Sequence, residues 1–211
     1  MPGLHHIRQI DDAMSENIGK IKEKALEEGV PIIKDEGLAF LLNVINEHGC
    51  KDILELGTAV GYSAIEMAKC DPAIRIDTIE KNEEMYRQAL ANIRREGLEG
   101  RIKVHFTPIE DFHTDRMYDL IFVDAAKAQY GKYLEQFLPN LKEDGIMLFD
   151  NTVFHGLIYE ADTIASRSLR ALVKKIIKFR EKVLNDDRFD IIMFDGIGDG
   201  ILILTRRNRE A

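Results

Sequence analysis

The 211-residue sequence has only two cysteines, five prolines and no tryptophan. The cysteines, Cys50 and Cys70, form no CxxC pair and are too few for a disulfide framework, so we expect reduced thiols in a cytoplasmic protein. No apolar run approaches the roughly 18 residues that a membrane helix needs, and the first residues contain no apolar stretch of the kind found in secretory signals. These absences argue against a disulfide scaffold and against a membrane protein.

The sequence also has no excess of positive charge, because 29 lysines and arginines face 37 acidic residues and the net charge is -8. The molecule as a whole should therefore not attract nucleic acid or acidic membranes, which leaves only local basic patches to consider. Internal repeats, low-complexity tracts and linker-like stretches are missing as well. The length suits one α/β domain over residues 1–211, with residues 1–30 as a helical N-terminal extension.

What the sequence does contain is an alternation of helix-like and strand-like segments. Apolar residues at helical spacing predict two N-terminal helices, over residues 11–28 and 35–47. Predicted strands follow at residues 52–56, 75–79, 102–106, 120–123 and 145–149, and predicted helices at 63–68, 83–96, 130–138 and 167–184. Residues 190–194 and 201–204 are too close for a helical crossover and predict an antiparallel hairpin. We therefore expect a doubly wound, Rossmann-like sheet of about seven strands, mostly parallel.

A loop with two glycines follows the first predicted strand and reads ELGTAVGYS, from Glu55 to Ser63. Ligands of such sheets bind outside the carboxyl ends of the strands, and glycine lets the backbone approach a ligand closely. Glu80 ends the next predicted strand, where an acidic residue can accept both ribose hydroxyls. The loop has Ala59 where NAD-binding loops need a glycine for the pyrophosphate. S-adenosylmethionine (SAM) has no phosphate and fits better, although the loop alone is also compatible with a ligand-free turn.

Oxygen donors follow two further predicted strands. Asp124 comes after the strand at 120–123, and Asp150 and Asn151 come after the strand at 145–149. Carboxylate and amide oxygens without histidine or cysteine suit Mg²⁺, and also Mn²⁺, rather than zinc. Each aspartate alone could instead be a helix cap or a turn residue. Lys127 lies three residues past Asp124, within reach of a substrate hydroxyl, and is a candidate general base.

The motifs ELGTAVGYS, Glu80, DAAK and DN, in this order, resemble the class I cation-dependent O-methyltransferases. This family includes catechol O-methyltransferase and the plant caffeoyl-coenzyme A O-methyltransferases. The resemblance runs from about residue 30 to the end of the chain and implies a homodimer. It implies a SAM site formed by Ile33, Glu55, Gly57, Thr58, Gly61, Ser63, Glu80, Ile109, Glu110 and Asp124. It also implies a Mg²⁺ site of Asp124, Asp150 and Asn151, with Lys127 as the base.

Two departures from the family pattern limit this transfer of roles. The loop that should contact adenine reads Thr107-Pro108-Ile109-Glu110, where the family usually begins with glycine. The second acidic residue that catechol enzymes place against their substrate has no convincing counterpart, which argues mildly against a plain catechol.

The sequence also supports an expectation about which molecule accepts the methyl group. Within the family, the layout most resembles bacterial enzymes that methylate 5-hydroxyuridine at the tRNA wobble position to 5-methoxyuridine. Four basic residues of the predicted helix at 167–184 share one face, which could follow the phosphates of an anticodon loop: Arg167, Arg170, Lys174 and Lys178. Four ring-bearing residues are candidates for stacking on bases: Tyr130, Phe154, His155 and Tyr159.

Three alternatives stay open at this point. The basic helix face is equally compatible with a solvated amphipathic helix. The acceptor could be a small catechol-type or phenolic molecule, or the chain could be a non-catalytic SAM-binding protein. Arg180 falls on the apolar side of the predicted helix, and nothing in the sequence explains it.

Overall fold

The sheet has seven strands in the order β3-β2-β1-β4-β5-β7-β6 in the computed structural model, which describes residues 17–207. The strands are β1 (Asp52–Leu56), β2 (Arg75–Glu80), β3 (Ile102–Phe106), β4 (Tyr118–Val123), β5 (Leu141–Phe149), β6 (Phe189–Phe194) and β7 (Ile201–Arg206). Strands β1 to β5 pair in parallel, whereas β7 is antiparallel to both β5 and β6. The predicted mostly parallel sheet with a C-terminal antiparallel hairpin is confirmed.

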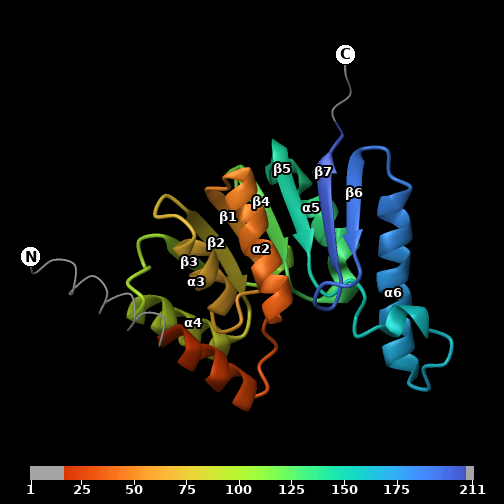
Figure 1. The fold of residues 1–211 in the computed structure, drawn as a ribbon, viewed down its shortest axis with the longest axis horizontal. Coiled ribbons are helices and arrows are strands. Elements are labelled where there is room, and N and C mark those ends of the chain that lie inside the picture. The colour runs from red at the N-terminus through yellow and green to blue at the C-terminus, as the bar shows by residue number, and fades with distance from the viewer. Residues whose placement is uncertain (1–16, 208–211) are drawn as a thin grey trace, which may run out of the picture.

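Helices cover both faces of this sheet (Figure 1). Residues 17–27 are helical, within the predicted helix at 11–28, and residues 11–16 lie outside the described part of the chain. The other helices are α2 (Asp35–His48), α3 (Tyr62–Lys69), α4 (Glu83–Arg95), α5 (Tyr130–Phe137) and α6 (Arg167–Leu184). Short 3₁₀ turns are η1 (Ile109–Asp111), η2 (Lys127–Gln129), η3 (Leu138–Asn140) and η4 (Leu157–Tyr159). None of the described helices is long and apolar enough to cross a membrane.

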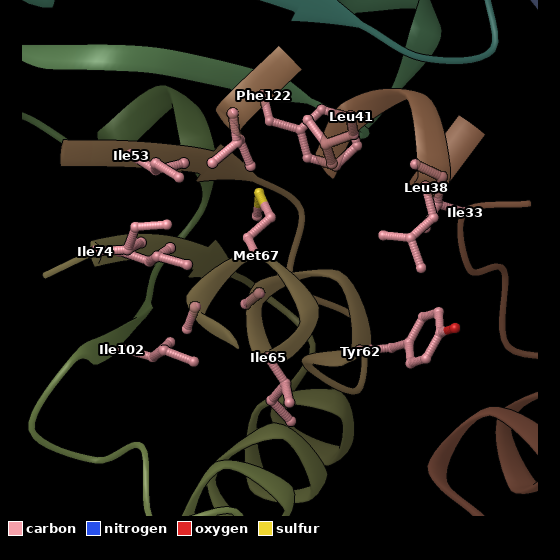
Figure 2. Packing of buried hydrophobic residues seen from close by; sticks show 14 of the residues in the cluster. Ile33, Leu38, Leu41, Ile53, Tyr62, Ile65, Met67, Ile74, Ile102 and Phe122 are labelled. Carbon is pink, nitrogen blue, oxygen red and sulfur yellow. The ribbon is translucent and has the colours of Figure 1, made fainter. Parts of the chain in front are cut away.

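Alternate residues of the central strands enter two separate apolar clusters, as expected for a sheet buried on both faces. In β4, Leu120 and Phe122 pack with α2, α3 and α4, whereas Ile121 and Val123 pack with α5 and α6. Met67 of α3 points into the first cluster, near Leu41 of α2 and Ile53 of β1 (Figure 2). The two clusters fix the orientation of the strands, and thereby the end of the sheet at which polar side chains emerge.

Strand β5 begins earlier than the sequence pattern indicates, at Leu141 rather than Gly145. Three polar residues, Lys142 to Asp144, follow Leu141 and mask the strand signal, and the pairing with β4 shifts register between Tyr118 and Leu120. Leu141 is nevertheless buried and pairs with Tyr118. The other predicted boundaries that fall within residues 17–207 differ from the observed ones by no more than two residues.

The strand register determines which residues share the functional end of the sheet. Leu56 of β1 pairs with Val123 of β4, and Val123 pairs in turn with Phe149 of β5. The residues that follow these three, Gly57, Asp124 and Asp150, therefore emerge side by side at the carboxyl ends of neighbouring strands.

Candidate functional site

A cavity of about 310 Å³ lies over the carboxyl ends of β1, β2 and β4. Nine residues predicted to bind cofactor or to act in catalysis line it: Ile33, Gly57, Thr58, Ser63, Glu80, Ile109, Glu110, Asp124 and Lys127. Glu55 lies buried below the cavity, and Gly61 is the N-cap of α3. Sequence reasoning did not identify other lining residues, including Tyr62, Met85 and Tyr133, because they follow ordinary helical spacing.

Gly57 makes the close approach of β1 and β4 possible at the floor of the cavity. Its φ is +104°, and a Cβ atom there would lie 2.3 Å from the carbonyl oxygen of Asp124. No side chain fits in that position, so the predicted role of Gly57 in shaping the loop has a steric basis.

Glu55 is a fully buried carboxyl group next to the cavity. Ser63 Oγ donates a hydrogen bond to Glu55 Oε1 at 2.5 Å, and Thr78 Oγ1 donates to Oε2 at 2.5 Å. Burial raises the pKa of Glu55 to about 8, although the two hydroxyl donors oppose this effect. At neutral pH the group therefore holds a proton, and a cationic ligand group nearby would favour its ionisation.

Glu80 is held rigidly at the end of β2. Its Oε2 accepts a hydrogen bond from the backbone N–H of Ala59 at 2.9 Å, and its Oε1 accepts from that of Asn82 at 2.8 Å. Each carboxylate oxygen keeps a free lone pair for a further donor such as a ribose hydroxyl. Asn82 in turn caps α4 through Met85, which fixes the start of that helix.

Asp124, Asp150 and Asn151 form a group of oxygen donors beside the cavity. The backbone N–H of Asp124 donates to Leu56 O, and that of Asp150 donates to Val123 O, both at 3.1 Å. Burial and the neighbouring Asp124 carboxylate raise the pKa of Asp150 to about 7. Burial also raises the pKa of Asp124, with Lys127 acting in the opposite direction.

Asn151 completes this group with an atom that has no hydrogen-bond partner. Its Oδ1 is buried and unpaired in the described residues, and its backbone is left-handed with φ of +64°. Residues 17–207 contain no cluster of three or more histidine, cysteine, aspartate or glutamate side chains suited to a metal. The donors here are two repelling carboxylates and an orphaned amide oxygen, a set that a hard divalent cation would satisfy.

A second layer of side chains surrounds these donors. Tyr130 is fully buried, and its hydroxyl donates to the carbonyl oxygen of Asp150 at 2.6 Å. The expectation that Tyr130 stacks on a base is therefore wrong, because its ring packs against Phe149 and Phe179. Lys127 Nζ lies 5.7 Å from the centre of the Phe154 ring, within range of a cation–π interaction.

Asp199 is a site residue that sequence reasoning missed. Its carboxylate is nearly buried and pairs with Lys34 Nζ at 2.7 Å and His155 Nδ1 at 3.0 Å. Its carbonyl oxygen accepts from the backbone N–H groups of Val153 and Phe154. The only sequence signal for Asp199 was the glycine-rich turn at residues 196–200. Its glycines indicated a close contact with another segment, but they did not show which segment.

The predicted basic face of α6 is only partly free. Arg167, Lys174 and Lys178 are exposed, whereas Arg170 is half-buried and donates twice to the carbonyl oxygen of Ile164, at 2.6 and 2.9 Å. Arg170 therefore secures the start of the helix rather than facing outward with the other three.

Comparisons with known proteins agree with this geometry. A family model described as O-methyltransferase matches residues 10–208. Caffeoyl-CoA O-methyltransferase from Populus kitakamiensis is 31% identical, over 97% of this chain and 88% of that protein. A Staphylococcus aureus crystal structure, provisionally described as a caffeoyl-CoA O-methyltransferase, has a TM-score of 0.86 and 31% identity, covering 97% of this chain and 100% of that one.

A methyltransferase from Podospora anserina, solved with bound SAH, shares the fold alone. Its TM-score is 0.80 at 24% identity, over 93% of this chain and 88% of that one. The family match covers nearly the whole sequence, and it confirms the expected SAM-dependent O-methyltransferase class. The chain belongs to the SAM-dependent O-methyltransferase family.

Proposed function

We propose that this protein transfers the methyl group of SAM to a hydroxyl group of a small phenolic acceptor, and that the reaction depends on a divalent cation such as Mg²⁺. The observation that carries the proposal is the position of Asp124. It lines the predicted cofactor cavity, and its carboxylate also acts on Asp150 in the donor group. Cofactor and cation would therefore meet at one residue, which is where methyl transfer needs them.

The cavity offers matching contacts along the length of SAM. Glu80 would accept the ribose hydroxyls, and Ile109 and Glu110 would lie on the adenine side. Glu55 and Ser63 would face the methionine end, where the cationic ammonium and sulfonium groups would favour an ionised Glu55. Ile33 would cover the cofactor from the segment before α2.

Asp124, Asp150 and Asn151 would hold the cation. When bound, such a cation orients an acceptor hydroxyl and makes its proton easier to remove. Lys127 would take that proton as the neutral amine, a form that a divalent cation nearby would favour. The methyl group then forms a bond to the acceptor oxygen as its bond to the sulfonium sulfur breaks, leaving S-adenosylhomocysteine and a methyl ether. Alignment of the two reactants would supply much of the rate gain, up to ~7–11 kcal/mol.

A phenolic acceptor is better supported than the tRNA acceptor expected first. The Populus relative is described as a caffeoyl-CoA O-methyltransferase, and caffeoyl-CoA is a phenolic thioester. Methylation of 5-hydroxyuridine in tRNA is the second candidate, and one observation favours it. Arg167, Lys174 and Lys178 are exposed on α6, the helix that follows the 151–160 loop in the sequence.

The test is labelled-methyl transfer from SAM to caffeoyl-CoA, catechol and tRNA carrying 5-hydroxyuridine, measured side by side. We expect label in the phenolic acceptors far above that in tRNA. Label in tRNA alone would overturn the phenolic acceptor, and exchange of Lys174 and Lys178 for alanine should then weaken tRNA binding in a salt-dependent way. Label in none of them, with SAM bound, would point to a non-catalytic protein.

A further inference from the structure

Arg180 is a nearly buried cation on the apolar side of α6, with its side chain only 13% exposed. Its guanidinium donates to both carboxylate oxygens of Asp195, at 2.9 and 2.8 Å. It also donates to the carbonyl oxygen and the hydroxyl of Thr152, at 3.5 and 3.3 Å. The unexplained position of this arginine in the sequence therefore has a structural reason.

The contacts of Arg180 reach both ends of the loop over residues 151–160. Thr152, at the start of the loop, contacts Arg180 directly. Tyr159, near its end, donates its hydroxyl to Asp195 Oδ2 at 2.6 Å. Asp195 thus joins Arg180 to Tyr159. Helix α6 lies beside β6 at the sheet edge (Figure 1), and through Arg180 it contacts the loop near both of its ends.

The backbone of the 151–160 loop is strained. Asn151, Phe154 and His155 all have left-handed backbones, with φ of +64°, +49° and +55°. Such residues cost about 1–3 kcal/mol each and persist only when their surroundings hold them. The backbone N–H groups of residues 152–154 are held by the carbonyl oxygens of Gly200 and Asp199, at 2.8 to 3.2 Å.

The same loop carries the groups that face the proposed reaction. Asn151 supplies the orphaned Oδ1 atom of the donor group, and the Phe154 ring lies against the Lys127 ammonium. Arg180 contacts the residue directly after Asn151, but it does not line the cofactor cavity.

We propose that Arg180 is a positioning residue: through Thr152 and Asp195 it holds the 151–160 loop in the strained conformation that presents Asn151 to a divalent cation. This inference rests on the proposed function for the role of the cation. Arg180 should therefore affect the binding of the cation and of the acceptor. It should not affect the binding of SAM, because other elements form the cofactor cavity.

The experiment compares four variants with the wild-type protein. Arg180→Ala removes both contacts, and Arg180→Lys keeps the charge without the two-pronged geometry. Tyr159→Phe is the mildest change, because it removes one hydroxyl from a residue that is 66% exposed. Arg188→Ala is the matched control: Arg188 also pairs with two carboxylates, those of Glu135 and Asp186, away from the loop.

Three quantities are measured: hydrogen exchange at the amides of residues 152–154, Mn²⁺ binding by electron paramagnetic resonance, and SAM binding by calorimetry. Arg180→Ala should speed exchange at these amides and weaken Mn²⁺ binding by about 10-fold or more, as expected for a residue that orients a ligand. Arg180→Lys should show intermediate exchange rates and an intermediate Mn²⁺ affinity. Tyr159→Phe should also speed exchange and weaken Mn²⁺ binding, but less than Arg180→Ala. SAM affinity should stay within about 2-fold throughout, and Arg188→Ala should match the wild type in all three.

Two results would overturn the inference. The first is unchanged exchange at residues 152–154 in Arg180→Ala. The second is unchanged Mn²⁺ affinity in that variant when the wild type binds Mn²⁺. If the wild type binds no Mn²⁺, the proposed function and the cation-presenting role of Arg180 both fail, while the exchange data still decide whether Arg180 holds the loop. A further comparison adds Asp195→Ala and the Arg180→Ala/Asp195→Ala double variant; a double variant no worse than either single one would show that the two residues act together.

Discussion

At the scale of single residues, the site is distinguished by carboxyl groups placed where ionisation is unfavourable. Glu55 is buried under the cavity, and Asp150 is buried beside Asp124, so the pKa of each is raised, to about 8 and about 7. Asp119, a carboxylate outside the site, behaves differently: backbone N–H donors and Lys142 hold its pKa below its ordinary value despite its partial burial. The structure therefore keeps at the site carboxyl groups whose ionisation is unfavourable, and a bound cationic ligand would make their ionisation more favourable.

Glu55 should make the stability of the cofactor-free protein depend on pH. Because its pKa rises from 4.5 to about 8 on folding, the folded chain binds more protons than the unfolded chain between these values. The free energy of unfolding should therefore fall as the pH rises through this window. Urea denaturation at pH 6 and pH 9 should show a smaller fall for Glu55→Gln than for the wild type. An equal fall in both proteins would contradict the assignment.

Asp150→Asn should stabilise the protein in the presence of EDTA while removing cation binding. The amide removes a charge that is buried next to the Asp124 carboxylate, so the melting temperature at pH 8 should rise. Asp119→Asn is the control and should have the opposite effect, because Lys142 and two backbone N–H groups would lose a charged partner. A lower melting temperature for Asp150→Asn would show that the two carboxylates do not repel each other as described.

At the scale of elements, the strand ends and the glycines between them build the site. Gly57→Ala would place a Cβ atom 2.3 Å from the carbonyl oxygen of Asp124, so the loop after β1 must move. We expect at least about 10-fold weaker SAM binding, since a tenfold loss needs only ~1.4 kcal/mol. Gly49→Ala is the matched control: Gly49 also has a positive φ, +62°, but has open space around it. That change should cost about 1–2 kcal/mol of stability and leave SAM affinity intact, as calorimetry can show.

The sequence predicted the elements better than the contacts between them. Strands such as β1 and β3, and helix α6, have the expected bounds because their apolar periodicity is strong. Gly57, Glu80 and Asp124 were found because the carboxyl ends of parallel strands meet at one edge, whereas Ile33, Ile109 and Glu110 were expected only from the family resemblance. Asp199 and Arg180 were not found as site residues, because their role depends on how the β6–β7 turn and α6 approach the 151–160 loop. Such approaches follow from tertiary packing, which no local pattern encodes.

At the scale of the whole molecule, one α/β unit combines a cofactor cavity, a candidate cation site and a strained loop. The net charge of -8 provides no long-range attraction for an anionic acceptor, so local contacts would have to bind it. The predicted tRNA contacts depend on a few side chains of α6, and they stay a prediction.

The homodimer also stays a prediction at this scale. Light scattering of the purified protein should give twice the chain mass of 24.1 kDa. A mass near that of a single chain, at concentrations where the enzyme is active, would contradict it.

The most direct test of the account is the cation dependence of methyl transfer to caffeoyl-CoA. Activity should disappear in EDTA and return with excess Mg²⁺, and Asp150→Asn should be at least ~100-fold less active even in saturating Mg²⁺, since a bound cation supplies several kcal/mol of stabilisation. Methyl transfer that persists in EDTA, or in Asp150→Asn at the wild-type rate, would show that Asp124, Asp150 and Asn151 do not hold a catalytic cation.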